Sequence, residues 1–135
     1  MPAQKEVVSS FIMRDGKILL VKRSHQVGSY RGYWSAISGY LEEKPLEHAL
    51  REIEEETGLS GRDIELVTRG RPLLIEDEEL DTIWKIHPFL FSYVGKHIIK
   101  LNWENEECRW IEVGQLANYT TVPGLKDVLD RVYTP

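Results

Sequence analysis

Residues 39–59 decide the fold of this chain, and they read GYLEEKPLEHALREIEEETGL. Pro45 suits the first position of a helix, where its missing N–H removes no hydrogen bond and its φ is already helical. Gly58 suits the position just past the end, where a left-handed residue closes the last turn. Residues at helical spacing between these two form one apolar stripe: Leu46, Leu50, Ile53 and Thr57. We therefore predict an amphipathic α-helix over residues 45–57.

The same segment carries the whole charge imbalance of the protein. The chain has 135 residues and a net charge of −5, from 17 Lys and Arg against 22 Asp and Glu. Residues 42–56 hold seven of these acids and only two of the bases, so the rest of the chain is neutral. An acidic balance argues against broad binding to nucleic acids or anionic membranes. The concentration of acidic residues in one predicted helix indicates instead a local binding site or a solvated helix face.

Three of the glutamates are spaced so that their side chains converge. Glu52, Glu55 and Glu56 are related by i+3 and i+4 steps and lie, with His48, on the wheel flank opposite the other helix acids. Like charges at this spacing destabilise a bare helix, and a hard divalent cation such as Mg²⁺ would relieve the repulsion. A solvated glutamate-rich face with an Arg51–Glu55 pair is the alternative. His48 is expected at the surface rather than as a general base.

The wider pattern resembles the signature of the Nudix hydrolase family. That signature is a Gly, a spacer, a Glu, seven residues, and then Arg-Glu-apolar-x-Glu-Glu-x-Gly-apolar. Residues 51–59 match every fixed position, and seven residues separate Glu43 from Arg51. The family has five residues between Gly and Glu, whereas Gly39 and Glu43 enclose three, so the loop before the helix is two residues shorter. Weaker similarities are Trp34 ahead of the motif and an acidic segment at 104–110 that ends in Trp.

The resemblance implies an α+β fold, an α/β/α sandwich around a mixed sheet, in one domain over residues 1–135. It implies Mg²⁺-dependent hydrolysis, with Mn²⁺ as a substitute, of a nucleoside diphosphate linked to another moiety X. In that reaction an activated water attacks the pyrophosphate. The metal ligands would be Glu52, Glu55 and Glu56 with the Gly39 carbonyl, and Glu52 is the first candidate for the base.

The resemblance also suggests roles outside the acidic helix. Glu104 is expected to be the additional catalytic acid from a distant loop, with Glu107 as second choice. Arg51 and Glu43 are expected to orient neighbouring groups. The further residues assigned to substrate phosphate are Arg23 and Arg31, in the polar stretch before the motif.

Other classes of function stay open. The shortened loop is compatible with a catalytically impaired Nudix-fold module that binds or regulates, although such a module has no need of a like-charge cluster. Isoprenoid diphosphate isomerisation is a third reading, which the lone Cys108 supports only weakly. The single cysteine and the absence of an apolar N-terminal stretch favour a cytoplasmic protein. A small-molecule nucleotide is the expected partner, without a membrane or a stable nucleic acid, and a homodimer is compatible with the resemblance.

The rest of the chain is predicted as short strands and a second helix. Val7–Arg23 is expected to be a β-hairpin around Asp15-Gly16. The further predicted elements are strands near 64–74, 84–94 and 107–113 and a C-terminal helix that starts near Pro123-Gly124. Pro88 indicates an edge strand or a bulge, and the acidic loop at 76–81 is expected to be solvated.

Overall fold

The structure is a computed structural model, and it describes residues 1–134. In chain order the elements are β1 (Ala3–Arg14), β2 (Lys17–Arg23), β3 (Trp34–Ser35), β4 (Ile37–Tyr40), α1 (Pro45–Thr57), β5 (Ile64–Arg69), β6 (Leu73–Asp77), β7 (Thr82–Tyr93), β8 (Asn105–Glu112), the 3₁₀ helix η1 (Val113–Asn118) and α2 (Leu125–Val132). None of the helices in this described part is long and apolar enough to span a bilayer.

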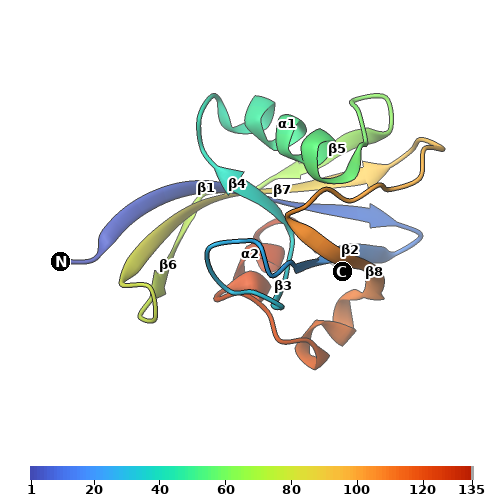
Figure 1. The fold of residues 1–135 in the computed structure, drawn as a ribbon. Coiled ribbons are helices and arrows are strands. Elements are labelled where there is room, and N and C mark those ends of the chain that lie inside the picture. The colour runs from blue at the N-terminus through green and yellow to red at the C-terminus, as the bar shows by residue number, and fades with distance from the viewer. Residues whose placement is uncertain (135) are drawn as a thin grey trace.

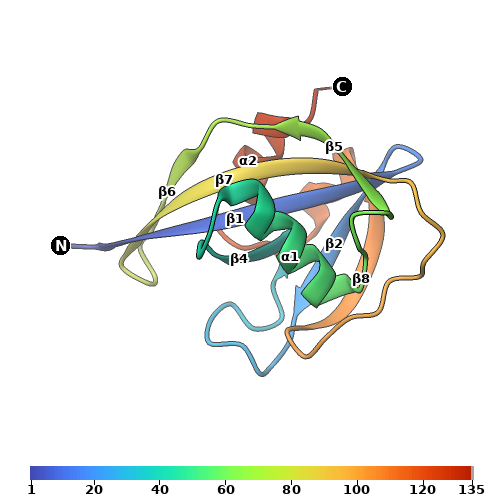
Figure 2. The ribbon, with the colours of Figure 1, turned by 90° about the horizontal axis from the view of Figure 1, so that it is seen from above.

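The architecture is a mixed sheet between two helical layers, as Figure 1 shows with α1 above the sheet and α2 and η1 below. Strand β1 runs parallel to β7 on one side and antiparallel to β4 and β2 on the other. Strand β2 continues the sheet to β8 and β3, and β7 continues it to β5 and β6. Seen from above, α1 crosses the strands obliquely (Figure 2). The α+β sandwich expected from the sequence is confirmed.

Both local predictions at the start of the chain are confirmed. Strands β1 and β2 pair with Met13 opposite Ile18, and the turn between them has positive φ at Asp15 (50°) and Gly16 (76°). A two-residue turn of this kind matches the twist of antiparallel strands. Helix α1 begins at Pro45, and Gly58 ends it with φ 77° while its N–H donates to the Glu54 carbonyl.

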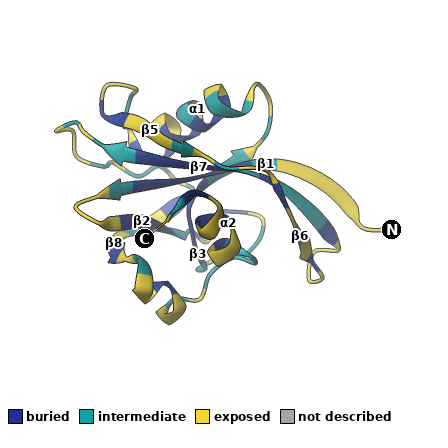
Figure 3. Ribbon diagram, turned by 180° about the vertical axis from the view of Figure 1, so that it is seen from behind, coloured by how far each residue is buried: buried dark blue, intermediate teal, exposed yellow. Residues whose placement is uncertain are grey.

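Two apolar cores hold the layers together, one on each face of the sheet. Helix α1 packs Ala49 and Ile53 against a core that includes Phe89 and Phe91. Helix α2 packs on the other face through the side chains Leu125, Val128, Leu129 and Val132. Figure 3 shows the central strands buried and the outer helix surfaces exposed. The predicted C-terminal amphipathic helix is therefore confirmed.

The buried face of α1 coincides with the predicted stripe only in part: Ile53 and Thr57 are fully buried, but the face extends further round the helix. Leu46 and Leu50 are only half-buried, whereas His48, Glu52 and Glu56 are buried. The expectation of a surface His48 was therefore wrong. The helical periodicity of the leucines does not determine how the helix rotates on the sheet. Packing over β4 and β7 turns it so that the side that carries Ala49 faces the strands.

Pro88 does not mark an edge strand. Strand β7 is interior, with β1 on one side and β5 and β6 on the other. Pro88 lies opposite Ser9, and on its second side the partner strands are interrupted between Arg69 and Leu73, where Gly70 N–H donates to the Pro88 carbonyl. The missing N–H of proline thus falls where no strand needs it.

The expected solvated turn at 76–81 also contains a buried carboxylate. Asp77 is 4% exposed and accepts hydrogen bonds from Tyr30 Oη at 2.7 Å, Trp84 Nε1 at 3.0 Å and the Leu80 N–H at 3.1 Å. These bonds hold the pKa of Asp77 below its usual range against the effect of burial. Through Tyr30 they also tie the loop 24–33 to the tip of β6.

Candidate active site

Three carboxylates from two distant parts of the chain meet beside the C-terminal half of α1. Oxygen atoms of Glu52, Glu56 and Glu104 all lie within 4.8 Å of one another. Glu52 and Glu56 are one helical turn apart on the same side of α1, and both are buried. Glu104 comes from the loop that leads into β8. Sequence spacing brought the first two together, and the fold adds the third.

The backbone around Glu104 is fixed by hydrogen bonds. Its N–H donates to Asn102 Oδ1 at 3.0 Å, and its carbonyl accepts from the Ser24 N–H at 2.9 Å. Glu107, the second choice for this role, lies instead 3.0 Å from Arg109 Nε and outside the cluster. The structure therefore places the first of the two predicted loop acids beside the helix glutamates.

Glu56 is the most buried member of the cluster. Its residue is 3% exposed, and its Oε1 accepts a hydrogen bond from Asn105 Nδ2 at 2.8 Å. The other oxygen, Oε2, is buried without a hydrogen-bond partner among residues 1–134. Burial raises the pKa of Glu56 well above its usual value, and the neighbouring charge of Glu104 raises it further.

Glu52 occupies a space that only glycine leaves open. A Cβ built on Gly39 would lie 2.4 Å from the Glu52 carboxyl carbon, so any side chain at position 39 displaces this carboxylate. Burial raises the pKa of Glu52 to about 7, and the charge of Glu55 adds to the effect. The shortened loop after Gly39 thus preserves the close approach of Gly39 to the helix.

Glu55 lies outside the converging carboxylates. Its side chain is 52% exposed, and the Arg51 Nε atom is 3.9 Å from its Oε1. Arg51 also pairs with both acids of the short loop, at 3.0 Å to Glu42 Oε2 and 3.3 Å to Glu43 Oε1. Arg51 thus contacts the three acids that flank it on the solvent side, and it lies on the outer surface of the helix.

The two arginines assigned to phosphate lie in different surroundings. Arg23 is partly buried at the end of β2, and it donates through Nε and Nη2 to the Ser29 carbonyl at 3.0 and 2.9 Å. Burial lowers the pKa of Arg23, while the charges of Glu56 and Glu104 oppose this shift. Arg31 donates from Nε to the Val27 carbonyl at 2.8 Å, within the same loop. Of the two, Arg23 is the cation associated with the carboxylate cluster.

Sequence reasoning missed two residues that contact the cluster. Asn105 supplies the amide that binds Glu56, and its position next to Glu104 was the available signal. His48 is fully buried, with Nε2 3.1 Å from Glu52 Oε1. The sequence shows that His48 lies one turn before Glu52, but its burial depends on how the helix packs.

The cluster fits a divalent cation. Its donor atoms are all carboxylate oxygens, which Mg²⁺ and Mn²⁺ accept readily. One of them, Glu56 Oε2, is buried and lacks any other partner in the described chain. Three carboxylates this close repel one another, and a bound cation would satisfy both the lone oxygen and the repulsion.

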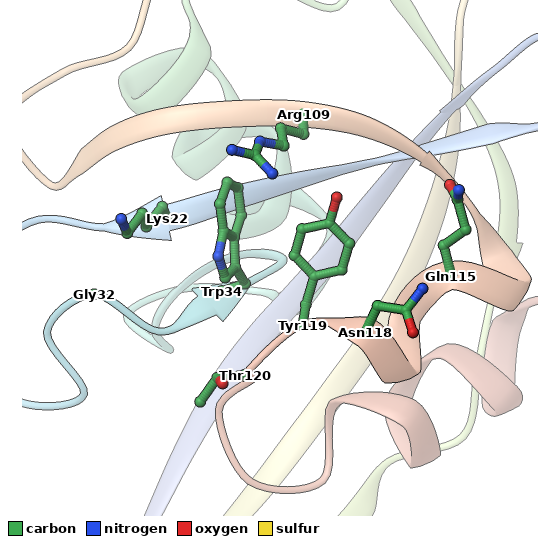
Figure 4. Close-up of a pocket in the computed structure, with 8 residues that line it drawn as sticks. All are labelled: Lys22, Gly32, Trp34, Arg109, Gln115, Asn118, Tyr119 and Thr120. Atoms are coloured by element: carbon green, nitrogen blue, oxygen red, sulfur yellow. The ribbon is translucent and has the colours of Figure 1, made fainter.

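A separate polar cavity of about 500 Å³ lies on the α2 face of the sheet. Figure 4 shows Trp34 and Tyr119 side by side beneath Arg109, with Lys22 at one end of the cavity and the amides of Gln115 and Asn118 at the other. The Arg109 guanidinium carbon is 5.1 Å from the Trp34 ring centre. Lys22 precedes Arg23 in β2, so the cavity and the carboxylates adjoin the end of the same strand.

Similar proteins of known structure share the fold over nearly the whole chain. A NUDIX hydrolase from Nitrosomonas europaea superposes with a TM-score of 0.78 at 18% identity, over 96% of this chain and 92% of the other. A MutT protein from Methanosarcina mazei Go1 (22% identity) and a C. elegans Ap4A hydrolase (15% identity) each have a TM-score of 0.74, and each alignment covers 96% of this chain and 93% of the other.

A curated relative shares part of its length with this chain. An octanoyltransferase from Myxococcus xanthus is 27% identical in an alignment 127 residues long that covers 87% of this chain. The chain spans about a third (32%) of the length of that protein. The similarity therefore concerns one segment of the larger protein.

The family assignment rests on a match along almost the full length. The model of the NUDIX domain matches residues 4–132, which include the carboxylate cluster and both helical layers. The chain therefore belongs to the NUDIX domain family.

Proposed function

We propose that this protein hydrolyses a nucleoside diphosphate linked to another group, with Mg²⁺ or Mn²⁺ held by Glu52, Glu56 and Glu104. The observation that carries the proposal is the buried, unpartnered Oε2 of Glu56 within a cluster of three carboxylates. A bound divalent cation supplies charge neutralisation at the pyrophosphate and activates water. Glu55, although it lies outside the converging carboxylates, and the Gly39 carbonyl belong to the proposal as additional oxygen donors.

Glu52 is the proposed base. With the cation bound, the Glu52 carboxylate is ionised, and an ionised carboxylate can accept a proton from an attacking water. The close approach of Gly39 and the other two carboxylates define the position of the Glu52 carboxylate. Arg51, held by Glu42 and Glu43, keeps positive charge on the outer side of the helix.

Arg23 is the proposed phosphate contact. Its guanidinium donates hydrogen bonds to the backbone of the loop 24–33 and interacts electrostatically with Glu56 and Glu104. A guanidinium is suited to phosphate oxygens because its N–H groups form a planar fork. Arg31 can act on substrate only if it leaves its bond to Val27, so we assign it a secondary role.

The cavity beside β2 is the proposed place for an organic part of the substrate. Its volume, about 500 Å³, is within the range of small-molecule sites. Trp34 and Tyr119 offer ring surface, and Asn118 and Gln115 offer amide groups for hydrogen bonds. One neighbour in fold is an Ap4A hydrolase, so dinucleoside polyphosphates belong among the first compounds to test, with nucleoside triphosphates and ADP-ribose.

The test is a screen of these compounds with Mg²⁺ or Mn²⁺, with released phosphate or nucleoside monophosphate as the readout. We expect hydrolysis of at least one compound that stops on chelation. Glu56→Gln should lower kcat by about 10²–10³-fold, as the loss of a central charged group does in other enzymes, and Glu55→Gln should lower it less. Glu47→Gln, on the exposed side of α1, is the matched control. Wild-type rates in Glu56→Gln would exclude the metal site.

The same screen separates the enzyme from an impaired binding module. A module that only binds would show a divalent-dependent change in Tm and bind nucleotides, but no compound would be turned over. Such a result would leave the carboxylate cluster as a metal site and refute the hydrolase proposal.

A further inference from the structure

His48 is a buried histidine that the proposed mechanism does not yet use. It projects from the second turn of α1 and has no exposed surface. A histidine on a helix face is usually placed so that at least one edge of the ring reaches water. Here both ring nitrogens face charged side chains of the same helix, Arg51 on one edge and Glu52 on the other.

The contact with Arg51 determines which ring nitrogen carries the proton. Arg51 Nη2 is 3.0 Å from His48 Nδ1, and a guanidinium can only donate. Nδ1 must therefore be the acceptor, so in the neutral ring the proton lies on Nε2. Arg51, a residue of the family motif about one helical turn away, thus holds the ring in one tautomer.

The Nε2 proton faces Glu52. Nε2 lies 3.1 Å from Glu52 Oε1, yet it is buried and forms no hydrogen bond with any of residues 1–134 in the present orientation of the two side chains. The separation fits a hydrogen bond once the N–H points at Oε1. A buried N–H without an acceptor is strongly unfavourable, so this contact has a clear energetic reason to form.

Glu52 is confined from two sides as a result. The backbone of Gly39 touches its carboxyl group, and the His48 ring contacts one of its oxygens. A residue that donates a hydrogen bond to one oxygen of a reacting carboxylate leaves the second oxygen free and limits rotation of the carboxylate. Partners of this kind commonly decide how well a metal or catalytic group is oriented.

We propose that His48 is a positioning residue, which donates a hydrogen bond from Nε2 to Glu52 and holds that carboxylate in its working orientation against Gly39. The inference rests on the proposed function, because it assumes that Glu52 acts in hydrolysis. It adds a chain of contacts from the acids of the short loop through Arg51 and His48 to Glu52.

The experiment compares three variants with the wild-type protein under the substrate and Mg²⁺ conditions of the screen. His48→Met keeps a similar volume without a donor, and His48→Gln keeps an amide N–H near the place of Nε2. His87→Met is the matched control, since His87 forms a comparable pair with Glu6, Nε2 to Oε2 at 2.8 Å, outside the cluster. The readouts are kcat, KM and Tm for each variant.

We expect His48→Met to lower kcat about 10–100-fold with KM within a factor of three. His48→Gln should recover most of the rate, and His87→Met should leave it unchanged. A purely structural role would lower Tm in both His48 variants without this difference in kcat. Equal kcat in His48→Met and wild type would overturn the inference, as would equal loss in the Met and Gln variants. If wild-type protein itself has no chelation-sensitive activity, the proposed function fails instead.

Discussion

Removal of the divalent cation should make the protein less stable as the pH rises through neutrality, and Glu52→Gln isolates the cause. Burial raises the pKa of Glu52 from 4.5 to about 7, so the folded state holds its proton more tightly than the unfolded chain. The stabilisation from this group is complete below the unfolded pKa and is lost as the pH rises through the folded one. It therefore disappears between about pH 5 and pH 8.

The size of the effect follows from the shift. A change from 4.5 to about 7 corresponds to at most roughly 3 kcal/mol. Glu52 lies at the margin of the buried helix face, and screening by solvent reduces this to about 1–2 kcal/mol. For a chain of this length, that is about 4–7 °C in Tm. Glu52→Gln removes the titrating group and keeps the volume, so it should melt at the wild-type temperature near pH 5 and about 4–7 °C higher near pH 8.

The assay is thermal unfolding by circular dichroism from pH 5 to pH 8.5, in EDTA and in excess Mg²⁺. In excess Mg²⁺ at high pH, wild type should melt at a higher temperature than Glu52→Gln. A cation that binds only the folded, ionised cluster stabilises the folded protein by mass action. Glu47→Gln is the control, and its difference from wild type should not change with pH. If wild type and Glu52→Gln follow parallel curves in EDTA, Glu52 does not hold a proton in the folded protein and the reasoning is refuted.

Three further changes test other contacts. Gly39→Ala places a Cβ 2.4 Å from the Glu52 carboxyl carbon, so kcat should fall about 10–100-fold while circular dichroism shows an intact fold. Insertion of two residues, one of them Gly, after Glu42 should break its 3.0 Å pair with Arg51; we expect lower kcat with less than about 1 kcal/mol change in stability, and a gain in rate would contradict it. Tyr30→Phe removes the 2.7 Å bond to a buried carboxylate of β6 and should cost about 1–3 kcal/mol in urea unfolding; an unchanged midpoint would exclude a structural role for this bond.

The limits of helix α1 could be predicted because they depend on single residues. Proline at the first position and glycine just past the last act through their own backbone, and the helix begins and ends at these positions. The hairpin at Asp15-Gly16 is equally local, since Asp and Gly are residues that tolerate the positive φ required at the two turn positions. Neither prediction needed to know what packs against the element.

The orientation of the helix could not be predicted in this way. A wheel shows which side chains share a face, but the sheet decides which face is covered. Contact with β4 and β7 buries Ala49 and brings Glu52 and Glu56 to the buried side of the helix. Glu55, which looked equivalent in the sequence, is left on the outside. Three glutamates with the same spacing therefore occupy two different environments.

Contacts between distant segments could not be predicted from the sequence for a different reason. Pro88 was expected at an edge strand or a bulge because proline lacks an N–H, but the gap between two partner strands meets the same requirement inside the sheet. Asp77 lies in a run of acids that gives no sign of burial, and it is buried because Tyr30 and Trp84 bring their donors to it. Each case depends on a partner supplied by another part of the fold.

The net charge of −5 has a different meaning once the helix is placed. The excess of acids lies in residues 42–56, yet two of those acids, Glu52 and Glu56, have raised pKa values because they are buried. Without a cation, the folded protein retains protons there that a formal count removes. With a cation, the same carboxylates ionise and the ion offsets their charge. In both states the charge near the site is less negative than the sequence indicates, so an anionic substrate can approach Arg23 without facing the full repulsion of the acidic helix.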